Sequence, residues 1–78
     1  MISKRGLVEG LIFASTHAVS KKSIAEILEM TAEDVDQTLE EIRVDFEREE
    51  HGFFLASIAG GYQFRTKSEL KETMARFY

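Results

Sequence analysis

The 78-residue chain contains no cysteine, no proline and no tryptophan. Without cysteine it forms no disulfide and has neither a thiolate metal ligand nor a cysteine nucleophile, which fits a reducing cytoplasm. It also lacks a long apolar run, because the segment Leu7–Ala14 is interrupted by Glu9 and is too short to span a bilayer. We therefore expect an ordinary first helix there, no signal peptide and no association with a membrane.

Basic residues are in the minority. Ten Lys and Arg against 14 Asp and Glu give a net charge of −4, which argues against a dedicated nucleic-acid binder. The hydrophobic content of 44% and the charged content of 31% are typical of an ordinary soluble globular protein. A chain of this length allows one small domain, residues 1–78, whose thin core often needs support from a partner.

The acidic residues are concentrated in one segment, Thr31–Glu50, which holds nine acids against two bases and carries a charge of −7. The segment is expected to form one long helix that Thr31 caps and Gly52 ends. Acids cover its remaining faces around a single apolar seam at helical spacing, formed by Val35, Leu39, Ile42 and Phe46.

Two shorter helices are predicted before this segment. Ser3 can cap the first, which runs to about Ser15, and Ser20 can cap the second, Lys21–Glu29. The first helix has a broad apolar face, and Phe13 points away from it. The residues available for the core are Leu7, Val8, Leu11, Ile12 and Ala14 in the first helix and Ile24, Ala25, Ile27 and Leu28 in the second.

Two short apolar runs, Phe53–Ile58 and Tyr62–Thr66, follow the acidic segment. They predict a β-hairpin with Gly60-Gly61 as a two-residue turn, because two glycines supply the positive φ that a tight turn needs. Both faces of the hairpin then carry apolar side chains, unless a bulge near Ser57 rotates Ile58 inward. Ser68 is expected to cap a last helix, Glu69–Tyr78, whose apolar face is formed by Leu70, Met74 and Phe77.

Three helices, a hairpin and a further helix predict an α+β fold, the winged helix-turn-helix, with the wing tip at Ala59–Gly61. In such a fold the third helix commonly enters a DNA groove, where attraction to phosphate supplies much of the affinity. A charge of −7 on Thr31–Glu50 opposes that approach. We therefore expect a fold that binds DNA in other proteins, but whose third helix does not bind DNA in this one.

Four stretches carry a family resemblance: VEGLIFA (Val8–Ala14), VSKKSIAEIL (Val19–Leu28), VDQTLEEIR (Val35–Arg43) and, most specifically, AGGYQFRT (Ala59–Thr66). By these stretches the chain resembles the N-terminal winged-helix domain of segregation and condensation protein B. Two connections differ from the family pattern. The family usually has Gly-Glu-Pro where this chain has Thr16-His17-Ala18, and Gly-Leu-Ser where it has Glu29-Met30-Thr31. The family also has a second winged-helix domain, so we expect this chain to be a fragment that holds the first.

The resemblance implies a protein without enzymatic activity. Members form homodimers, largely through this domain, and the dimer holds an extended segment of the kleisin subunit, segregation and condensation protein A. The kleisin in turn bridges the heads of the structural-maintenance-of-chromosomes ATPase. The implied role is the regulation of chromosome segregation and condensation, in the cytoplasm and at the nucleoid through the complex. The alternatives are a winged-helix transcription regulator that binds duplex DNA and a subunit of another nucleic-acid machine.

No catalytic, cofactor-binding or metal site is predicted. His17 and His51 are the only histidines, and each is expected to be a solvated loop residue. Consecutive carboxylates such as Glu40-Glu41 point to different faces of a helix. Gly60-Gly61 lacks the lysine and the helix of a phosphate-binding loop, and no loop offers calcium ligands around a sharp glycine turn.

Two sets of residues are candidates for binding. Four bases at the start of the second helix and at the base of the wing are possible weak phosphate contacts, namely Lys21, Lys22, Arg65 and Lys67. Apolar residues that cannot all face one small core form a candidate protein interface, namely Phe13, Val44, Phe54, Ile58 and Tyr62. The alternative for Phe54 and Ile58 is packing beneath the last helix.

Overall fold

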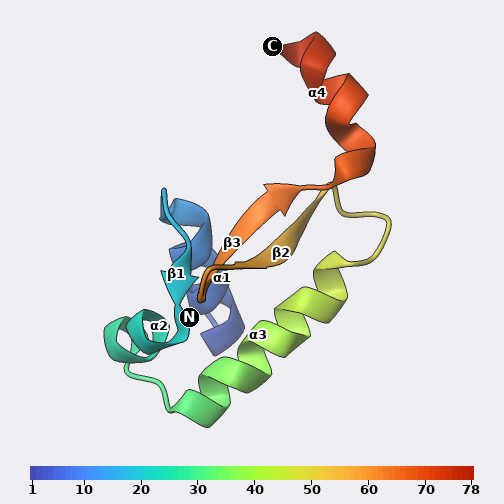
Figure 1. Ribbon diagram of the computed structural model, residues 1–78. Coiled ribbons are helices and arrows are strands. Elements are labelled where there is room, and N and C mark those ends of the chain that lie inside the picture. The colour runs from blue at the N-terminus through green and yellow to red at the C-terminus, as the bar shows by residue number, and fades with distance from the viewer.

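The elements follow the predicted order of three helices, a hairpin and a last helix, which confirms the winged-helix prediction (Figure 1). The computed structural model describes all residues, 1–78. The bounds of the elements are α1 Lys4–Ala14, β1 Val19–Ser20, α2 Lys21–Leu28, α3 Ala32–Phe46, β2 Phe53–Ile58, β3 Gly61–Thr66, the 3-10 turn η1 Ser68–Leu70 and α4 Lys71–Phe77.

The first three helices begin where the sequence places a capping side chain. The hydroxyl oxygens of Ser3, Ser20 and Thr31 each accept a hydrogen bond, at 3.1 Å, from the backbone N–H three residues further on. Each bond satisfies one of the N–H groups that a helix start leaves without a partner. Local sequence therefore fixes these three helix starts.

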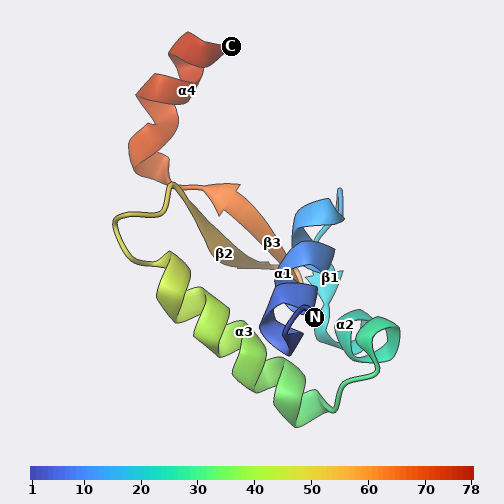
Figure 2. The same ribbon diagram turned by 180° about the vertical axis from the view of Figure 1, so that it is seen from behind.

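The core lies where α1, α2 and α3 meet the hairpin. Its fully enclosed side chains come from the predicted helix faces. Three residues that were expected to be available for the core are instead exposed, namely Leu7, Ala14 and Ile27. The buried core residues are Val8, Ile12, Val19, Ile24, Val35, Leu39, Ile42 and Leu55. Figure 2 shows α1 and α3 on the same side of the hairpin, and both helices contact its strands.

The acidic helix is shorter than predicted, because α3 ends at Phe46 and residues 47–52 form turns. The ring of Phe46 stacks on His51, with 4.3 Å between ring centroids, and lies 5.1 Å from Phe53 and 5.3 Å from Phe64. Those contacts require the chain to turn back directly after Phe46. Aromatic packing has thus overridden the helix-favouring sequence that continues towards Gly52.

The hairpin turn lies one residue earlier than predicted. Residues pair without a bulge from Phe53 opposite Thr66 to Ile58 opposite Gly61, so the turn is Ala59-Gly60 and Ile58 is not rotated inward. The φ angles are 45° at Ala59 and 81° at Gly60, as a turn with two left-handed central residues requires. Gly61 instead permits a close approach of Ala18.

A third strand was not predicted. β1 pairs antiparallel with β3, with Val19 opposite Tyr62 and Ser20 opposite Gly61, which gives the sheet order β1-β3-β2. A Cβ on Gly61 would lie 2.9 Å from the Cβ of Ala18, so a side chain there would push the strands apart. Two residues are too few for a periodic pattern, which is why the sequence did not reveal this strand.

The C-terminal arm, residues 68–78, projects away from the rest of the molecule (Figures 1 and 2). It begins with the turn η1, and Ser68 makes no capping hydrogen bond, so the predicted cap is wrong. No residue of α4 is buried. Leu70, at the base of the arm, lies near Gly52 and lines a hollow together with Phe54. α4 itself projects away from the sheet and does not cover it (Figures 1 and 2).

Candidate protein-interaction surfaces

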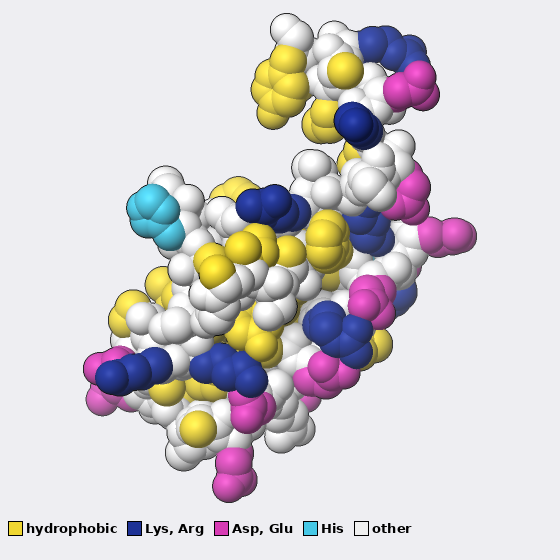
Figure 3. Space-filling model, in the orientation of Figure 1, with side chains coloured by type: hydrophobic (Ala, Val, Ile, Leu, Met, Phe, Trp, Pro, Cys, Tyr) yellow, Lys and Arg dark blue, Asp and Glu magenta, His cyan; other side chains and the backbone are white.

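Some of the carboxylates on α3 and in the turn after it pair with the two bases of the same segment, Arg43 and Arg48. Arg43 pairs with Glu40 and with Glu47, each at 2.6 Å, and Arg48 pairs with Glu50 at 2.7 Å. The hydrogen bond from Arg43 lowers the pKa of Glu40, so this carboxylate is ionised at neutral pH. In Figure 3, acidic side chains follow the edge of the molecule where α3 lies. The two bases are therefore occupied and offer little to a phosphate.

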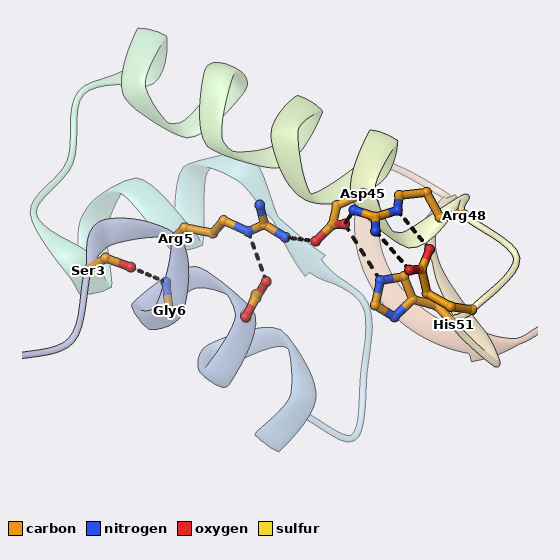
Figure 4. Close-up of polar contacts among 8 residues, drawn as sticks. Ser3, Arg5, Gly6, Asp45, Arg48 and His51 are labelled. Atoms are coloured by element: carbon orange, nitrogen blue, oxygen red, sulfur yellow. Dashed lines mark hydrogen bonds and ion pairs between the residues drawn. The ribbon is translucent and has the colours of Figure 1, made fainter.

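Asp45 joins the start of α1 to the end of α3. Its carboxylate accepts hydrogen bonds from Arg5 on α1 and from Arg48, the latter at 3.0 Å, and His51 Nε2 lies 3.6 Å away (Figure 4). The hydrogen bond from Arg5, with further help from His51 and Arg48, lowers the pKa of Asp45. This cluster stabilises the fold and presents no reactive group to a substrate.

The four candidate phosphate contacts do not form one basic patch. Lys21 pairs with Asp36 of α3 at 2.7 Å, and this hydrogen bond raises the pKa of the lysine. Lys67 donates to the backbone oxygen of Arg48 at 2.6 Å, and Arg65 donates to Gln63 at 3.4 Å. Lys22 is exposed and makes no ion pair.

The five candidate interface residues lie on different surfaces. Phe13 is 77% exposed on α1, and Val44 is 52% exposed on α3 among charged neighbours. Phe54 and Ile58 share the outer face of the hairpin, whereas Tyr62 packs against the core. The structure therefore does not gather these residues into a single patch.

Phe13 instead lies beside aromatic residues of the hairpin and of α3, which the sequence did not group with it. Two adjoining hollows, of about 300 and 270 Å³, are both lined by Phe13, Phe53 and Phe64. Phe53 and Phe64 meet edge to face, with 5.3 Å between centroids. We name this region the aromatic groove, and its defining residues are Gly6, Gly10, Phe13, Phe46, Phe53 and Phe64.

The aromatic groove is open at one glycine of α1. Gly6, Gly10 and Phe13 follow one another at i, i+4 and i+7, so they lie on one face of the helix. A Cβ built on Gly10 would meet no atom within 4 Å, so the face is free there, whereas a Cβ on Gly6 would lie 2.6 Å from Cγ2 of Ile2, which covers that end of the face. The spacing of the glycines relative to Phe13 was present in the sequence, but only the pairing of β2 with β3 brings Phe53 and Phe64 beside them.

The C-terminal arm carries a second unpartnered apolar surface. Phe77 and Tyr78 are 77% and 96% exposed, and their rings meet at 5.3 Å. Leu70, Met74 and Phe77 are spaced at i, i+4 and i+7, so they lie on the same face of the arm. In Figure 3, hydrophobic side chains occupy one side of the arm and charged side chains lie mostly on the other.

Neither histidine lies in a cluster of possible metal ligands, and no group of three or more such side chains is present. His17 is exposed in the connection after α1, as expected, whereas His51 is half-buried and stacks on Phe46, so the expectation of a solvated side chain is wrong for His51. None of the helices is both long enough and apolar enough to cross a membrane.

Comparison with known proteins gives consistent results. Residues 6–78 match the model of the family described as segregation and condensation complex subunit ScpB. The segregation and condensation protein B of Brevibacillus brevis is 36% identical over 66 residues, which are 83% of this chain and 34% of that protein. The protein of the same name from Moorella thermoacetica is 37% identical over 65 residues, which are 83% and 33% of the two chains. The chain thus spans about a third of the length of these relatives.

Two solved structures share the fold. One is described as the dimer of the ScpB N-terminal domain complexed with a ScpA peptide; it is 29% identical, with a TM-score of 0.89 over 95% of this chain and 93% of that one. ScpB from Mycobacterium tuberculosis is 15% identical and has a TM-score of 0.85 over 99% of this chain and 50% of that one, a likeness of fold. From the family match and these relatives, the chain belongs to the family of segregation and condensation complex subunit ScpB.

Proposed function

We propose that this chain is a non-enzymatic interaction module of the chromosome segregation and condensation complex. In this role it associates with a second copy of itself and binds an extended segment of the kleisin subunit, segregation and condensation protein A. The observation that carries the proposal is the relative solved as a dimer with a ScpA peptide, which aligns with 95% of this chain. Because the chain spans about a third of its full-length relatives, the proposal concerns the part played by this domain.

The surface chemistry supports binding to protein in preference to DNA. Large exposed apolar side chains, Phe13 and Phe77 among them, are more frequent at interfaces than on the surface of a small monomer. The outer face of α3 presents carboxylates whose basic neighbours are already paired. A groove-reading helix needs the opposite sign of charge.

Through the kleisin, the module would regulate the structural-maintenance-of-chromosomes ATPase. Its place would then be the cytoplasm, at the nucleoid when the complex is assembled. The ATPase rate of the assembled complex, measured with and without this chain, tests that step. An unchanged rate, with the kleisin demonstrably bound, would contradict a regulatory role and leave the binding role standing.

Two measurements test the binding role. Sedimentation equilibrium should find a dimer at high micromolar concentration, and a clean monomer there would remove the self-association. A pull-down should retain the kleisin, while a control kleisin from which the bound extended segment has been deleted should be lost. Titration with duplex DNA at low and at high salt distinguishes this function from that of a transcription regulator, because a regulator would bind DNA tightly and with a steep salt dependence.

A further inference from the structure

Beyond Leu70, the C-terminal arm has no partner among residues 1–67 (Figure 1). Its helix α4 has seven residues, Lys71–Phe77, and none of them is buried. An isolated helix of that length is marginal in water, and most helical stability comes from packing an apolar face. The arm has such a face, so its apolar residues need a surface to pack on.

The arm cannot reach the aromatic groove of its own chain. Only Lys67 separates the end of β3 from the turn η1, so the link is too short to reverse direction. Leu70 lies against Gly52 and fixes the direction in which the arm leaves the hairpin. Figures 1 and 2 both show the arm extending away from α1 and α3.

The aromatic groove is suited to a helix with an aromatic side chain. Gly10 leaves the face of α1 open beside Phe13, so another helix can approach closely there, while Ile2 closes the face at Gly6. Phe13, Phe53 and Phe64 surround a hollow in which a further aromatic ring would have edge and face contacts. A side chain such as Phe77, at the end of an apolar helix face, supplies that ring.

We propose that the arm of each copy packs into the aromatic groove of a second copy, and that the exchange is reciprocal. The inference rests on the self-association proposed above and specifies the surfaces that produce it. Both surfaces lie at the same end of the hairpin, since the groove includes Phe53 and Phe64 and the arm leaves next to Thr66. A two-fold axis at this end of the hairpin would place each arm in the groove of the other copy, so that both arms and both grooves are occupied, as in a self-complementary interface.

The absence of cysteine makes a direct test simple. A Gly10→Cys protein is mixed with a Tyr78→Cys protein, which keeps Phe77, under mild oxidation, and we expect a mixed disulfide between the two. Gly10 has open space for the new side chain, and Tyr78 is exposed, so neither change disturbs the fold. The matched control replaces Gly10→Cys with Val44→Cys on the far side of α3, which should give little mixed product.

A second test measures self-association of point variants. Phe77→Asp and Phe13→Asp should each raise the dimer dissociation constant by about tenfold or more, as loss of a central aromatic contact does. Phe77→Leu should retain most of the affinity, and Val44→Asp, which introduces the same charge at an exposed apolar residue of α3, should leave it unaltered. Circular dichroism of each variant confirms that the fold is retained.

The outcomes separate this inference from the proposed function. A wild-type monomer would remove the self-association itself. If the wild type is a dimer, but the two cysteine variants form no mixed disulfide and Phe77→Asp leaves the dissociation constant unchanged, the exchange of arms is overturned while the dimer stands. If Phe13→Asp leaves the dimer intact but abolishes retention of the kleisin, the groove holds the kleisin segment and our assignment of its occupant is wrong.

Discussion

The wing turn offers a prediction in which adding a glycine stabilises the protein. Ala59 has a φ of 45°, in the left-handed region that a residue with a Cβ adopts at a cost of about 1–2 kcal/mol. Ala59→Gly removes this cost, while the greater freedom of glycine in the unfolded chain returns about 0.4–1 kcal/mol. We expect a net gain of about 0.5–1 kcal/mol, or about 2–8 °C in Tm for a domain of this size.

Two neighbouring substitutions show whether the turn is placed correctly. Gly60 has a φ of 81° and no atom near a new Cβ, so Gly60→Ala should lose about 0.5–1 kcal/mol through backbone strain alone. At Gly61 a new Cβ would lie 2.9 Å from the Cβ and 3.0 Å from the carbonyl carbon of Ala18. Gly61→Ala should therefore cost about 1–3 kcal/mol, as forced overpacking does.

Urea unfolding followed by circular dichroism measures all three variants, at one protein concentration because a dimer's stability depends on it. Ala59→Asn serves as a companion, since Asn tolerates the left-handed region and should also stabilise. The reasoning fails if Ala59→Gly destabilises by more than about 0.5 kcal/mol. A harmful Ala59→Gly, with Gly60→Ala and Gly61→Ala each costing only the same backbone strain of about 0.5–1 kcal/mol, would move the turn to Gly60-Gly61.

Three further predictions follow from other parts of the fold. Ile42 is fully enclosed, so Ile42→Ala should cost about 2–5 kcal/mol by urea unfolding, and a loss below about 1 kcal/mol would contradict its place in the core. Glu29 ends α2 with a φ of 54°, and Glu29→Gly should stabilise by about 0.5–1 kcal/mol; lower stability would contradict the left-handed cap. Asp45 has a lowered pKa, so its contribution is present above the unfolded value of about 3.9 and is lost as pH falls through the lower folded value. Asp45→Asn should therefore destabilise at neutral pH and flatten the decline of stability below about pH 4, and an unchanged acid limb would argue against the cluster.

The helix starts and the core seam could be predicted because their causes are local. A hydroxyl three residues before a free N–H caps a helix wherever the helix packs, as Ser3, Ser20 and Thr31 do. The seam of α3 could be recognised because helical spacing places its apolar residues on one face. The family match confirms the resemblance that the Ala59–Thr66 stretch carried most specifically.

The candidate interface was harder to predict, because surface patches are assembled from distant parts of the chain. Phe13 was singled out for lying off the apolar face of its helix, but its neighbours Phe53 and Phe64 had been assigned only to strands. The arm was expected to be a last helix of the domain, and its separation from the body is visible only in three dimensions (Figure 1). Val44 lies apart from the other apolar candidates among charged side chains.

The sequence by itself determined the order of the elements, the helix starts, the buried seam and the acidic outer face of α3, because each depends on residues close together in the chain. Tertiary structure decided where α3 ends, which residues turn the hairpin and which aromatic rings meet. Phe46 stops the helix by packing on His51, Phe53 and Phe64, and β1 requires the close approach of Ala18 to Gly61. Those outcomes depend on contacts between residues far apart in sequence, whose packing energy exceeds the small preferences of local sequence.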